Sequence, residues 1–189
     1  MLDLSFVFLA GIGNSEPTHW QRLWCKDLAR TSPVLWVEHE NWTRVARNRW
    51  LSELDAALDG MAPGPDVVFV AHSLGCHLAA EWLDENPDSN VAAVFFAAPP
   101  DLAGECAQKD IAGFRTPFET SRIRCDGVVV ASEDDPYATL DYARRAAAHW
   151  NLPLVDVGKK GHINLASGLG AWPEGRELLT SLVAKRTAR

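Results

Sequence analysis

Residues 66–83 read DVVFVAHSLGCHLAAEWL and contain a sharp change of hydrophobic pattern. The first six residues are almost all apolar and show no alternation with polar residues, which is typical of a parallel strand buried on both faces. After a short turn around Ser73, the apolar residues Leu74, Leu78 and Trp82 recur every four positions, as on one face of a helix. The segment therefore predicts a buried strand, a tight turn and an amphipathic helix.

The same pattern recurs along the chain. Apolar runs predict strands at residues 4–10, 34–37, 66–71, 91–97, 127–131 and 152–157. Helical spacing predicts helices at about residues 17–28, 43–58, 74–85, 139–150 and 174–185. Because strands that alternate with helices form an α/β sheet, we expect about six mostly parallel strands with helices on both faces.

The chain has the length of one ordinary domain. A domain of 189 residues buries roughly 70% of the surface of its unfolded chain, so it needs no metal or disulfide for stability. No internal repeat or linker is visible, and residues 1–189 are expected to form one compact domain. Only residues 99–126 lose the regular pattern. They fit either a small lid over a site or a crossover connection with a distorted helix, so little or no cap is expected.

The composition excludes several classes of protein. With a formal net charge of -7, the chain lacks the basic surface that nucleic acids and anionic membranes require. Its four cysteines stand far apart without a CxxC pair, which argues against a zinc site and favours reduced thiols. No apolar stretch approaches the ~18 residues of a membrane helix, and no basic residues precede the run at 4–10 as in a signal peptide. We therefore expect a cytoplasmic protein without a membrane anchor, nucleic-acid partner, metal or cofactor.

The turn after the third predicted strand carries the first candidate functional residue. Ala71-His72-Ser73-Leu74-Gly75 matches the nucleophile-elbow pattern G-x-S-x-G, except that alanine replaces the first glycine. The pattern needs small residues because the serine lies in a strained turn where strand and helix approach closely. One extra methyl group is tolerable there, so the turn predicts a nucleophile at Ser73. The simpler alternative is that Ser73 only caps its helix.

Two later turns supply the base and the carboxylate that a serine nucleophile needs. Asp135 follows the fifth predicted strand and His162 the sixth, so the chain order is Ser73, Asp135, His162, as in α/β-hydrolases. Asp135 is favoured over the adjacent Asp134 because Pro136 restrains it to an extended conformation. Successive side chains that leave a strand also point to opposite sides, so only one aspartate faces the histidine.

Acyl transfer also needs hydrogen-bond donors for the oxyanion that develops on the substrate. The backbone N–H of Leu74 is one candidate, because it opens the helix after the nucleophile and the helix dipole reinforces it. The second candidate is the N–H of Ile12, in the turn Gly11-Ile12-Gly13-Asn14 after the first strand. That turn lacks the lysine and the glycine spacing of phosphate-binding loops, so nucleotide binding is not expected.

Further short motifs are spread over nearly the whole chain. They are Gly11, His19-Trp20-Gln21, His72-Ser73-x-Gly75, Ala98-Pro99-Pro100, Ser132 to Tyr137, Gly161-His162-Ile163-Asn164, Ser167 to Gly170 and Trp172-Pro173. Together they resemble the small serine hydrolases of the retinoblastoma-binding protein 9 and YdeN type, within the α/β-hydrolase superfamily. The resemblance implies a largely capless α/β-hydrolase fold, a triad of Ser73, Asp135 and His162, and hydrolysis of esters or related acyl bonds.

Other residues near these motifs have simpler explanations. His19 and Trp20 fit the mouth of the site, or a helix start beside a core tryptophan, equally well. His72 and His77 are expected to pack, and Cys76 lies inside a helix rather than at an elbow, which argues against a cysteine hydrolase. Four of the eight tryptophans fall on apolar helix faces, which indicates core packing rather than sugar binding.

The sequence therefore predicts a serine hydrolase that cleaves ester-type acyl bonds of small substrates through an acyl-enzyme intermediate. The alternative is a binding module that keeps this fold but acts through protein contacts with little turnover. The natural acyl substrate and the oligomeric state do not follow from the sequence.

Overall fold

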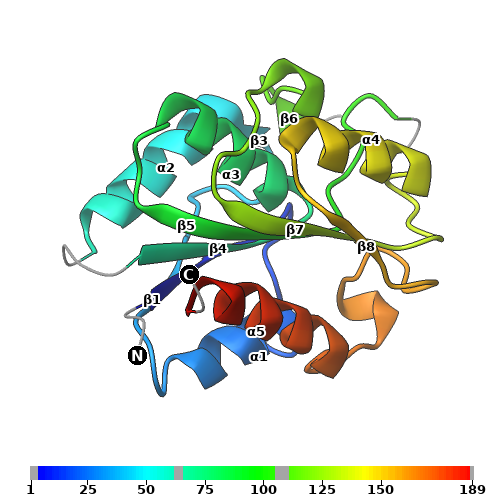
Figure 1. Ribbon diagram of the computed structural model, residues 1–189. Coiled ribbons are helices and arrows are strands. Elements are labelled where there is room, and N and C mark those ends of the chain that lie inside the picture. Colours follow the sequence, from blue (N-terminus) through cyan, green and yellow to red (C-terminus); the bar gives the residue numbers. More distant parts are fainter. Residues whose placement is uncertain (1–3, 62–65, 105–110, 188–189) are drawn as a thin grey trace.

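The computed structural model describes residues 4–61, 66–104 and 111–187, and its centre is a twisted sheet (Figure 1). Six strands of the described residues form this sheet in the order β2-β1-β4-β5-β7-β8, and every neighbouring pair is parallel. They are β1 (Leu4–Leu9), β2 (Val34–Trp36), β4 (Asp66–His72), β5 (Val91–Ala97), β7 (Asp126–Ala131) and β8 (Leu154–Asp156). The prediction of about six parallel strands is confirmed.

Helices cover both faces of the sheet, as predicted. In Figure 1, α1 (Trp20–Leu28) and α5 (Pro173–Thr187) lie on one face, and α2 (Arg47–Asp59), α3 (Leu74–Glu85) and α4 (Leu140–Trp150) lie on the other. Each face has its own hydrophobic core, and consecutive strand residues alternate between the two cores. On β5, for example, Phe96 points toward α2, α3 and α4, whereas Phe95 packs with α1 and α5. The central strands β1, β4, β5 and β7 are mostly apolar because both of their faces are buried.

The structure corrects the predicted start of the second helix. The helix expected at 43–58 begins at Arg47, because the two residues before it form a short strand, β3 (Val45–Ala46). This strand pairs in parallel with β6 (Ile111–Ala112), which lies in the irregular region 99–126. The same region contains the 3₁₀ helix η1 (Pro117–Glu119), and a second 3₁₀ helix, η2 (Leu165–Ser167), follows β8. Residues 105–110 of the irregular region lie outside the described residues.

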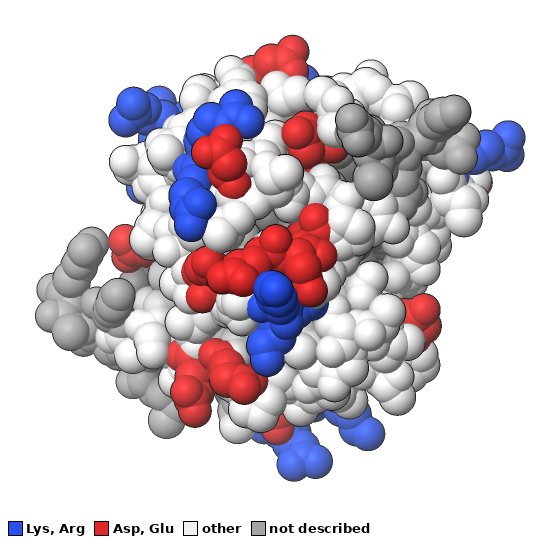
Figure 2. Space-filling model, turned by 90° about the vertical axis from the view of Figure 1, so that its right-hand side faces the viewer, with Lys and Arg blue, Asp and Glu red and all other residues white. Residues whose placement is uncertain are grey.

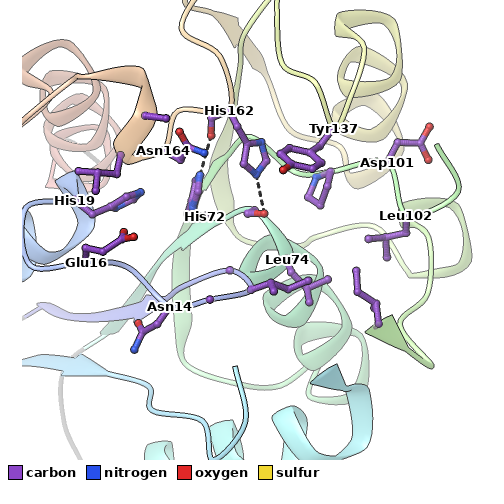
Figure 3. Close-up of a pocket in the computed structure, with 18 residues that line it drawn as sticks. Asn14, Glu16, His19, His72, Leu74, Asp101, Leu102, Tyr137, His162 and Asn164 are labelled. Atoms are coloured by element: carbon purple, nitrogen blue, oxygen red, sulfur yellow. Dashed lines mark hydrogen bonds between the residues drawn. The ribbon is translucent and has the colours of Figure 1, made fainter. Parts of the chain in front are cut away.

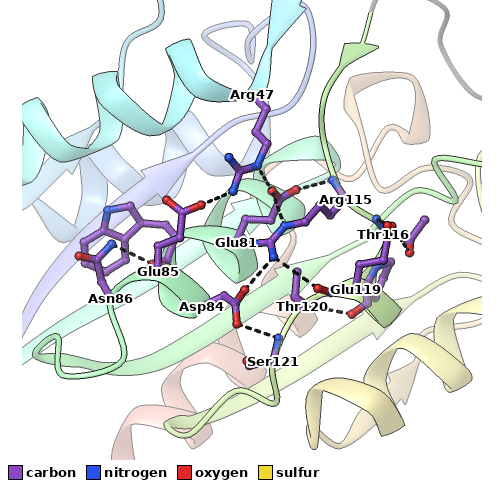
Figure 4. Close-up of polar contacts among 12 residues, drawn as sticks. Arg47, Glu81, Asp84, Glu85, Asn86, Arg115, Thr116, Glu119, Thr120 and Ser121 are labelled. Atoms are coloured by element: carbon purple, nitrogen blue, oxygen red, sulfur yellow. Dashed lines mark hydrogen bonds and ion pairs between the residues drawn. The ribbon is translucent and has the colours of Figure 1, made fainter.

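A buried carboxylate fastens the irregular region to α3 (Figure 4). The side chain of Glu81 is fully buried and forms ion pairs with Arg47 and Arg115. It also accepts a hydrogen bond of 2.8 Å from the backbone N–H of Arg115, whose guanidinium group pairs with Asp84 at 2.8 Å. Burial of the charge is tolerated because two guanidinium groups neutralise it. The cluster thereby fixes the chain just after β6. Ile111 of β6 lines the cavity described below.

Charged side chains of both signs are mixed on the face shown in Figure 2. Acidic side chains gather across the middle of this face, and basic side chains lie above and below them. This distribution differs from the continuous basic surface typical of nucleic-acid-binding proteins. No helix in the described part of the chain is long and apolar enough to cross a membrane.

Candidate active site

Ser73 joins β4 to α3 in a strained backbone conformation. Its φ is 54° and its ψ is -128°, a combination that residues other than glycine rarely adopt. The turn is held by a hydrogen bond of 2.9 Å from the Ser73 N–H to the carbonyl oxygen of Ala97. A Cβ atom on Gly75 would lie 2.3 Å from the carbonyl oxygen of Leu9, so only glycine lets α3 approach β1 this closely. Ala71, where the elbow pattern has glycine, is accommodated in the core.

Short hydrogen bonds join three side chains that come from different strand ends. The Ser73 Oγ lies 2.8 Å from the His162 Nε2, and the His162 Nδ1 lies 2.9 Å from each carboxylate oxygen of Asp135. Because a carboxylate only accepts hydrogen bonds, it fixes the imidazole proton on Nδ1 and leaves Nε2 able to accept the hydroxyl proton of Ser73. The fold thus brings together the three residues singled out in the sequence, in the arrangement that acyl transfer requires.

The adjacent Asp134 has different partners. Its Oδ1 accepts hydrogen bonds from the Gly161 N–H at 2.8 Å and from the Ser132 hydroxyl at 2.9 Å, and these bonds lower the pKa of the Asp134 carboxyl. The Ser132 hydroxyl in turn accepts a hydrogen bond of 2.8 Å from the Lys160 N–H. Asp134 therefore ties the turn after β7 to the loop that carries His162.

Buried rings hold the loop of His162 from its other side. The His72 Nε2–H donates to the carbonyl oxygen of His162 at 2.9 Å, and the Trp20 indole donates to the carbonyl oxygen of Ile163 at 2.8 Å. The ring of Tyr137 packs edge-on against the His162 imidazole, with centroids 4.6 Å apart. His72, interpreted from the sequence as a packing residue, thus also positions the backbone of the candidate base.

The two candidate oxyanion donors flank the serine. Leu74 is the first residue of α3, so its N–H has no acceptor within the helix. Ile12 lies in the loop after β1, which approaches Ser73 closely: a Cβ atom on Gly11 would lie 2.7 Å from the Ser73 Cβ and 3.1 Å from its Oγ. Both Ile12 and Leu74 line the same cavity as Ser73, so they stay the candidate donors.

A cavity of about 440 Å³ opens at Ser73 (Figure 3). Its lining residues are Gly11, Ile12, Gly13, Asn14, Glu16, His19, His72, Ser73, Leu74, Pro100, Asp101, Leu102, Ile111, Tyr137, His162, Asn164, Leu165 and Ala166. Figure 3 shows His19, Glu16, Asn14 and Asn164 to one side of His162, and Leu102, Asp101 and Tyr137 to the other. The sequence left the substrate-binding residues unassigned. The signals available were His19, for which one interpretation placed it at the mouth of the site, the motif at 98–100, and Asn164 in the tail motif.

Two further histidines stand in a row with His162. The ring centroids of His19 and His72 are 5.0 Å apart, and those of His72 and His162 are 5.1 Å apart. Burial, reinforced by the charge of His162, lowers the pKa of His19 to about 4 and that of His72 well below its usual value. Both rings are therefore neutral at pH 7 and offer hydrogen bonds rather than charge. No group of His, Cys, Asp and Glu among the described residues could hold a metal ion.

Comparison with known proteins assigns the chain to a family. The family model described as serine hydrolase matches residues 6–181. The chain belongs to the serine hydrolase family. The match includes the strained turn at Ser73 and the loops of Asp135 and His162, so the predicted enzyme class is confirmed. No curated protein matches the sequence of this serine hydrolase significantly.

Solved structures with the same fold include two YdeN-type proteins. A YdeN-like hydrolase from Pectobacterium atrosepticum is 25% identical, with a TM-score of 0.79 over 95% of this chain and 90% of the other. The ydeN gene product of B. subtilis is 19% identical, with a TM-score of 0.76 over 96% and 99%. Esterase 2 of Thermogutta terrifontis is 17% identical, with a TM-score of 0.70 over 97% and 84%. The α/β-hydrolase fold and the resemblance to YdeN-type serine hydrolases are confirmed.

Proposed function

We propose that this serine hydrolase is a carboxylesterase for small esters, in which Ser73 is the nucleophile, His162 the general base and acid, and Asp135 the orienting carboxylate. The observation that carries the proposal is the continuous pair of hydrogen bonds, 2.8 Å from Ser73 to His162 and 2.9 Å from His162 to Asp135, beside a cavity. The similarity in fold to the Thermogutta terrifontis esterase supports esters over other acyl compounds.

In the acylation step, the Ser73 Oγ attacks the ester carbonyl carbon while its proton passes to the His162 Nε2. The carbonyl oxygen becomes an oxyanion that accepts hydrogen bonds from the N–H groups of Ile12 and Leu74. Asp135 stabilises the imidazolium that forms. The ester C–O bond then breaks as His162 gives the proton to the departing alcohol, and Ser73 is left acylated.

In the deacylation step, a water molecule takes the place of the alcohol. His162 removes a proton from this water, whose oxygen attacks the acyl carbon and forms a second oxyanion in the same position. Collapse of that intermediate releases the carboxylic acid and returns the proton to Ser73. Ester and water are the only reactants that these steps consume.

The size of the cavity supports small substrates. Its volume of about 440 Å³ lies toward the lower end of the range of roughly 300–1,000 Å³ found for ligand sites. We therefore expect a series of p-nitrophenyl esters to be cleaved best with short acyl chains, with kcat/KM falling from butyrate to octanoate.

A fluorophosphonate label tests the assignment of Ser73. We expect the native protein to be labelled and Ser73→Ala to remain unlabelled while folded, with ester hydrolysis reduced on the order of 10⁶-fold. Ser52→Ala, at an exposed position of α2, is the matched control and should label as the native protein does. Labelling of Ser73→Ala would assign the nucleophile elsewhere. If the native protein neither labels nor cleaves any ester, the chain is a binding module instead.

We further propose a cytoplasmic location. Cys25 and Cys76 carry free thiols, the state that a reducing compartment maintains. The partner expected there is a small acyl substrate rather than a nucleic acid or a membrane.

A further inference from the structure

His19 presents a buried nitrogen without a partner to the wall of the cavity. The residue is 3% exposed, and its Nε2 forms no hydrogen bond with any described residue. His19 belongs to the cavity wall, and Figure 3 shows its ring reaching from the start of α1 toward His72. Because a buried polar atom without a partner costs stability, such atoms are rare and call for a ligand that satisfies them.

The other ring nitrogen decides where the proton of His19 lies. The Nδ1 accepts a hydrogen bond of 3.2 Å from the Gln21 N–H and thereby caps α1. Burial lowers the pKa of His19 to about 4, so at pH 7 the ring is neutral and carries one proton. Since Nδ1 is an acceptor, that proton is on Nε2. His19 therefore directs a hydrogen-bond donor into a place where the described residues supply no acceptor.

No hydrogen bond joins this donor to the neighbouring ring of His72. The plane of the His72 ring is tilted by 53° relative to that of His19, and its own Nε2–H is used on the carbonyl oxygen of His162. The exposed carboxylate of Glu16, three residues earlier in the chain, lines the same side of the cavity as His19 (Figure 3). This side of the cavity thus combines a donor with an acceptor-only group, the pair that one hydroxyl group satisfies at once.

The two sides of the cavity differ in their polar groups. Asn14 and Asn164 join Glu16 and His19 on one side, called the polar side, whereas Leu102 lies on the opposite side with Asp101 and Tyr137 (Figure 3). An ester bound at Ser73 has two parts, the acyl chain and the alcohol, which extend in different directions from the carbonyl carbon. An apolar acyl chain fits the side of Leu102, and the alcohol then lies on the polar side.

Resting on the proposed ester hydrolysis, we propose that this polar side binds the alcohol part of the substrate, and that the His19 Nε2–H donates a hydrogen bond to a hydroxyl oxygen of that alcohol. The substrate class is then small esters of hydroxylated alcohols, such as diols and polyols. Glu16 accepts the hydrogen bond that the same hydroxyl group donates. His19 is a specificity residue in this scheme, since it exchanges no proton with the reacting atoms.

Two substitutions separate the functions of the two ring nitrogens. His19→Asn keeps an acceptor close to the backbone, so the cap on α1 persists, because asparagine is a good N-cap residue. It removes the donor at the position of Nε2. His19→Gln places an amide N–H group near that position and loses the cap. Thermal melts of both variants report the cost to folding independently of substrate choice.

The experiment compares two butyrate esters that differ only in the alcohol, 2,3-dihydroxypropyl butyrate and propyl butyrate. The measured quantity is the ratio of their kcat/KM values. We expect the ratio to favour the dihydroxypropyl ester in the native protein and to fall about 3- to 10-fold in His19→Asn, the value of one neutral hydrogen bond. In His19→Gln the ratio should stay closer to the native value, although that variant loses the cap.

Each contrary outcome has a distinct meaning. An equal ratio in the native protein and both variants overturns the proposal, as does an equal fall in both variants, which would follow from a merely structural role. A matched pair of methyl esters that differ only in the acyl part, methyl butyrate and methyl 3,4-dihydroxybutyrate, tests the assignment of sides. If only this pair responds to His19→Asn, the polar side binds the acyl part instead. Absence of any Ser73-dependent hydrolysis would refute the proposed function rather than the role of His19.

Discussion

Replacement of Asp135 by asparagine removes the group that fixes the proton of His162. Both carboxylate oxygens lie 2.9 Å from the His162 Nδ1, and Oδ1 also accepts a hydrogen bond from the Tyr137 N–H at 2.9 Å. An asparagine with its carbonyl oxygen facing Tyr137 therefore turns its NH₂ group toward the Nδ1. The imidazole accepts that hydrogen bond only by moving its proton to Nε2. The Nε2 then faces the Ser73 hydroxyl as a donor and cannot remove its proton.

The expected loss for Asp135→Asn is about 10⁴-fold in kcat, as for the equivalent substitution in the serine protease triad, or about 5.5 kcal/mol of transition-state stabilisation. The neighbouring Asp134→Asn is the matched control. Its side-chain oxygen can still accept the hydrogen bonds from Ser132 and Gly161, so the loop of His162 stays in place. We expect a loss of about tenfold or less, the scale of one weakened charge-assisted hydrogen bond.

The assay is steady-state hydrolysis of p-nitrophenyl butyrate by both variants, with thermal melts to verify folding and mass spectrometry to exclude deamidated protein. Fluorophosphonate labelling should be slowed in Asp135→Asn and nearly native in Asp134→Asn. If Asp134→Asn suffers the large loss and Asp135→Asn the small one, the assignment of the acid is wrong by one residue. If neither variant loses activity, no aspartate of this turn orients the base.

Three further predictions concern stability. Gly75→Ala places a methyl group 2.3 Å from the backbone carbonyl oxygen of Leu9, and we expect a loss of about 3 kcal/mol or more, measured by urea unfolding. Glu81→Ala leaves two arginines without their buried partner, which should cost about 3–5 kcal/mol and lower Tm by roughly 6–20 °C. Burial lowers the pKa of His19 and His77 to about 4 from an ordinary 6.5, so the unfolded chain binds their protons first. Stability should therefore fall as pH falls from 6.5 to 4, by up to about 1.4 kcal/mol per pH unit for each histidine.

Matched controls separate these effects from general sensitivity to substitution. Gly60→Ala, at a helix end with a φ of -75°, should change stability by about 0.5 kcal/mol or less. Asp141→Ala breaks only an exposed pair with Arg145 and should also cost about 0.5 kcal/mol or less. His19→Asn should make the pH dependence of stability shallower between pH 6.5 and 5. A variant that behaves like its control, or an unchanged pH slope, would contradict the corresponding prediction.

The layers of the fold were predictable because one physical signal dominates them. Strands such as β4 and β5 are buried on both faces, so their apolar runs stand out against the amphipathic helices between them. The pairing of β3 with β6 carries no such signal. Each strand has two residues, and their partners are 66 positions apart, as between Val45 and Ile111. The sequence around Val45 has the same apolar spacing as the helix that follows it. The helix predicted at 43–58 therefore begins too early.

The site residues that lie in turns after strands could be predicted from the sequence. Ser73 and His162 lie at positions that parallel strands bring to one edge of the sheet, so chain order alone placed them together. The cavity wall was less accessible to sequence reasoning. Leu102 and Ile111 come from the irregular region, whose path depends on contacts such as the ion pairs of Glu81 with arginines on two other segments. For His19 the sequence left two interpretations open, and the structure shows that both apply, since the residue caps α1 and lines the cavity.

The close approach of Gly75 to the carbonyl group of Leu9 also links the two candidate oxyanion donors. Leu74 lies next to Gly75 at the start of α3, and Ile12 lies just beyond the end of β1, so this packing sets the spacing of their two N–H groups. The wall at Leu102 belongs to another segment with its own anchors. A substitution in that wall therefore alters the room for the acyl chain and leaves the packing of α3 on β1 in place. Selection for new substrates can act on the wall around Leu102 without disturbing the groups proposed to stabilise the transition state.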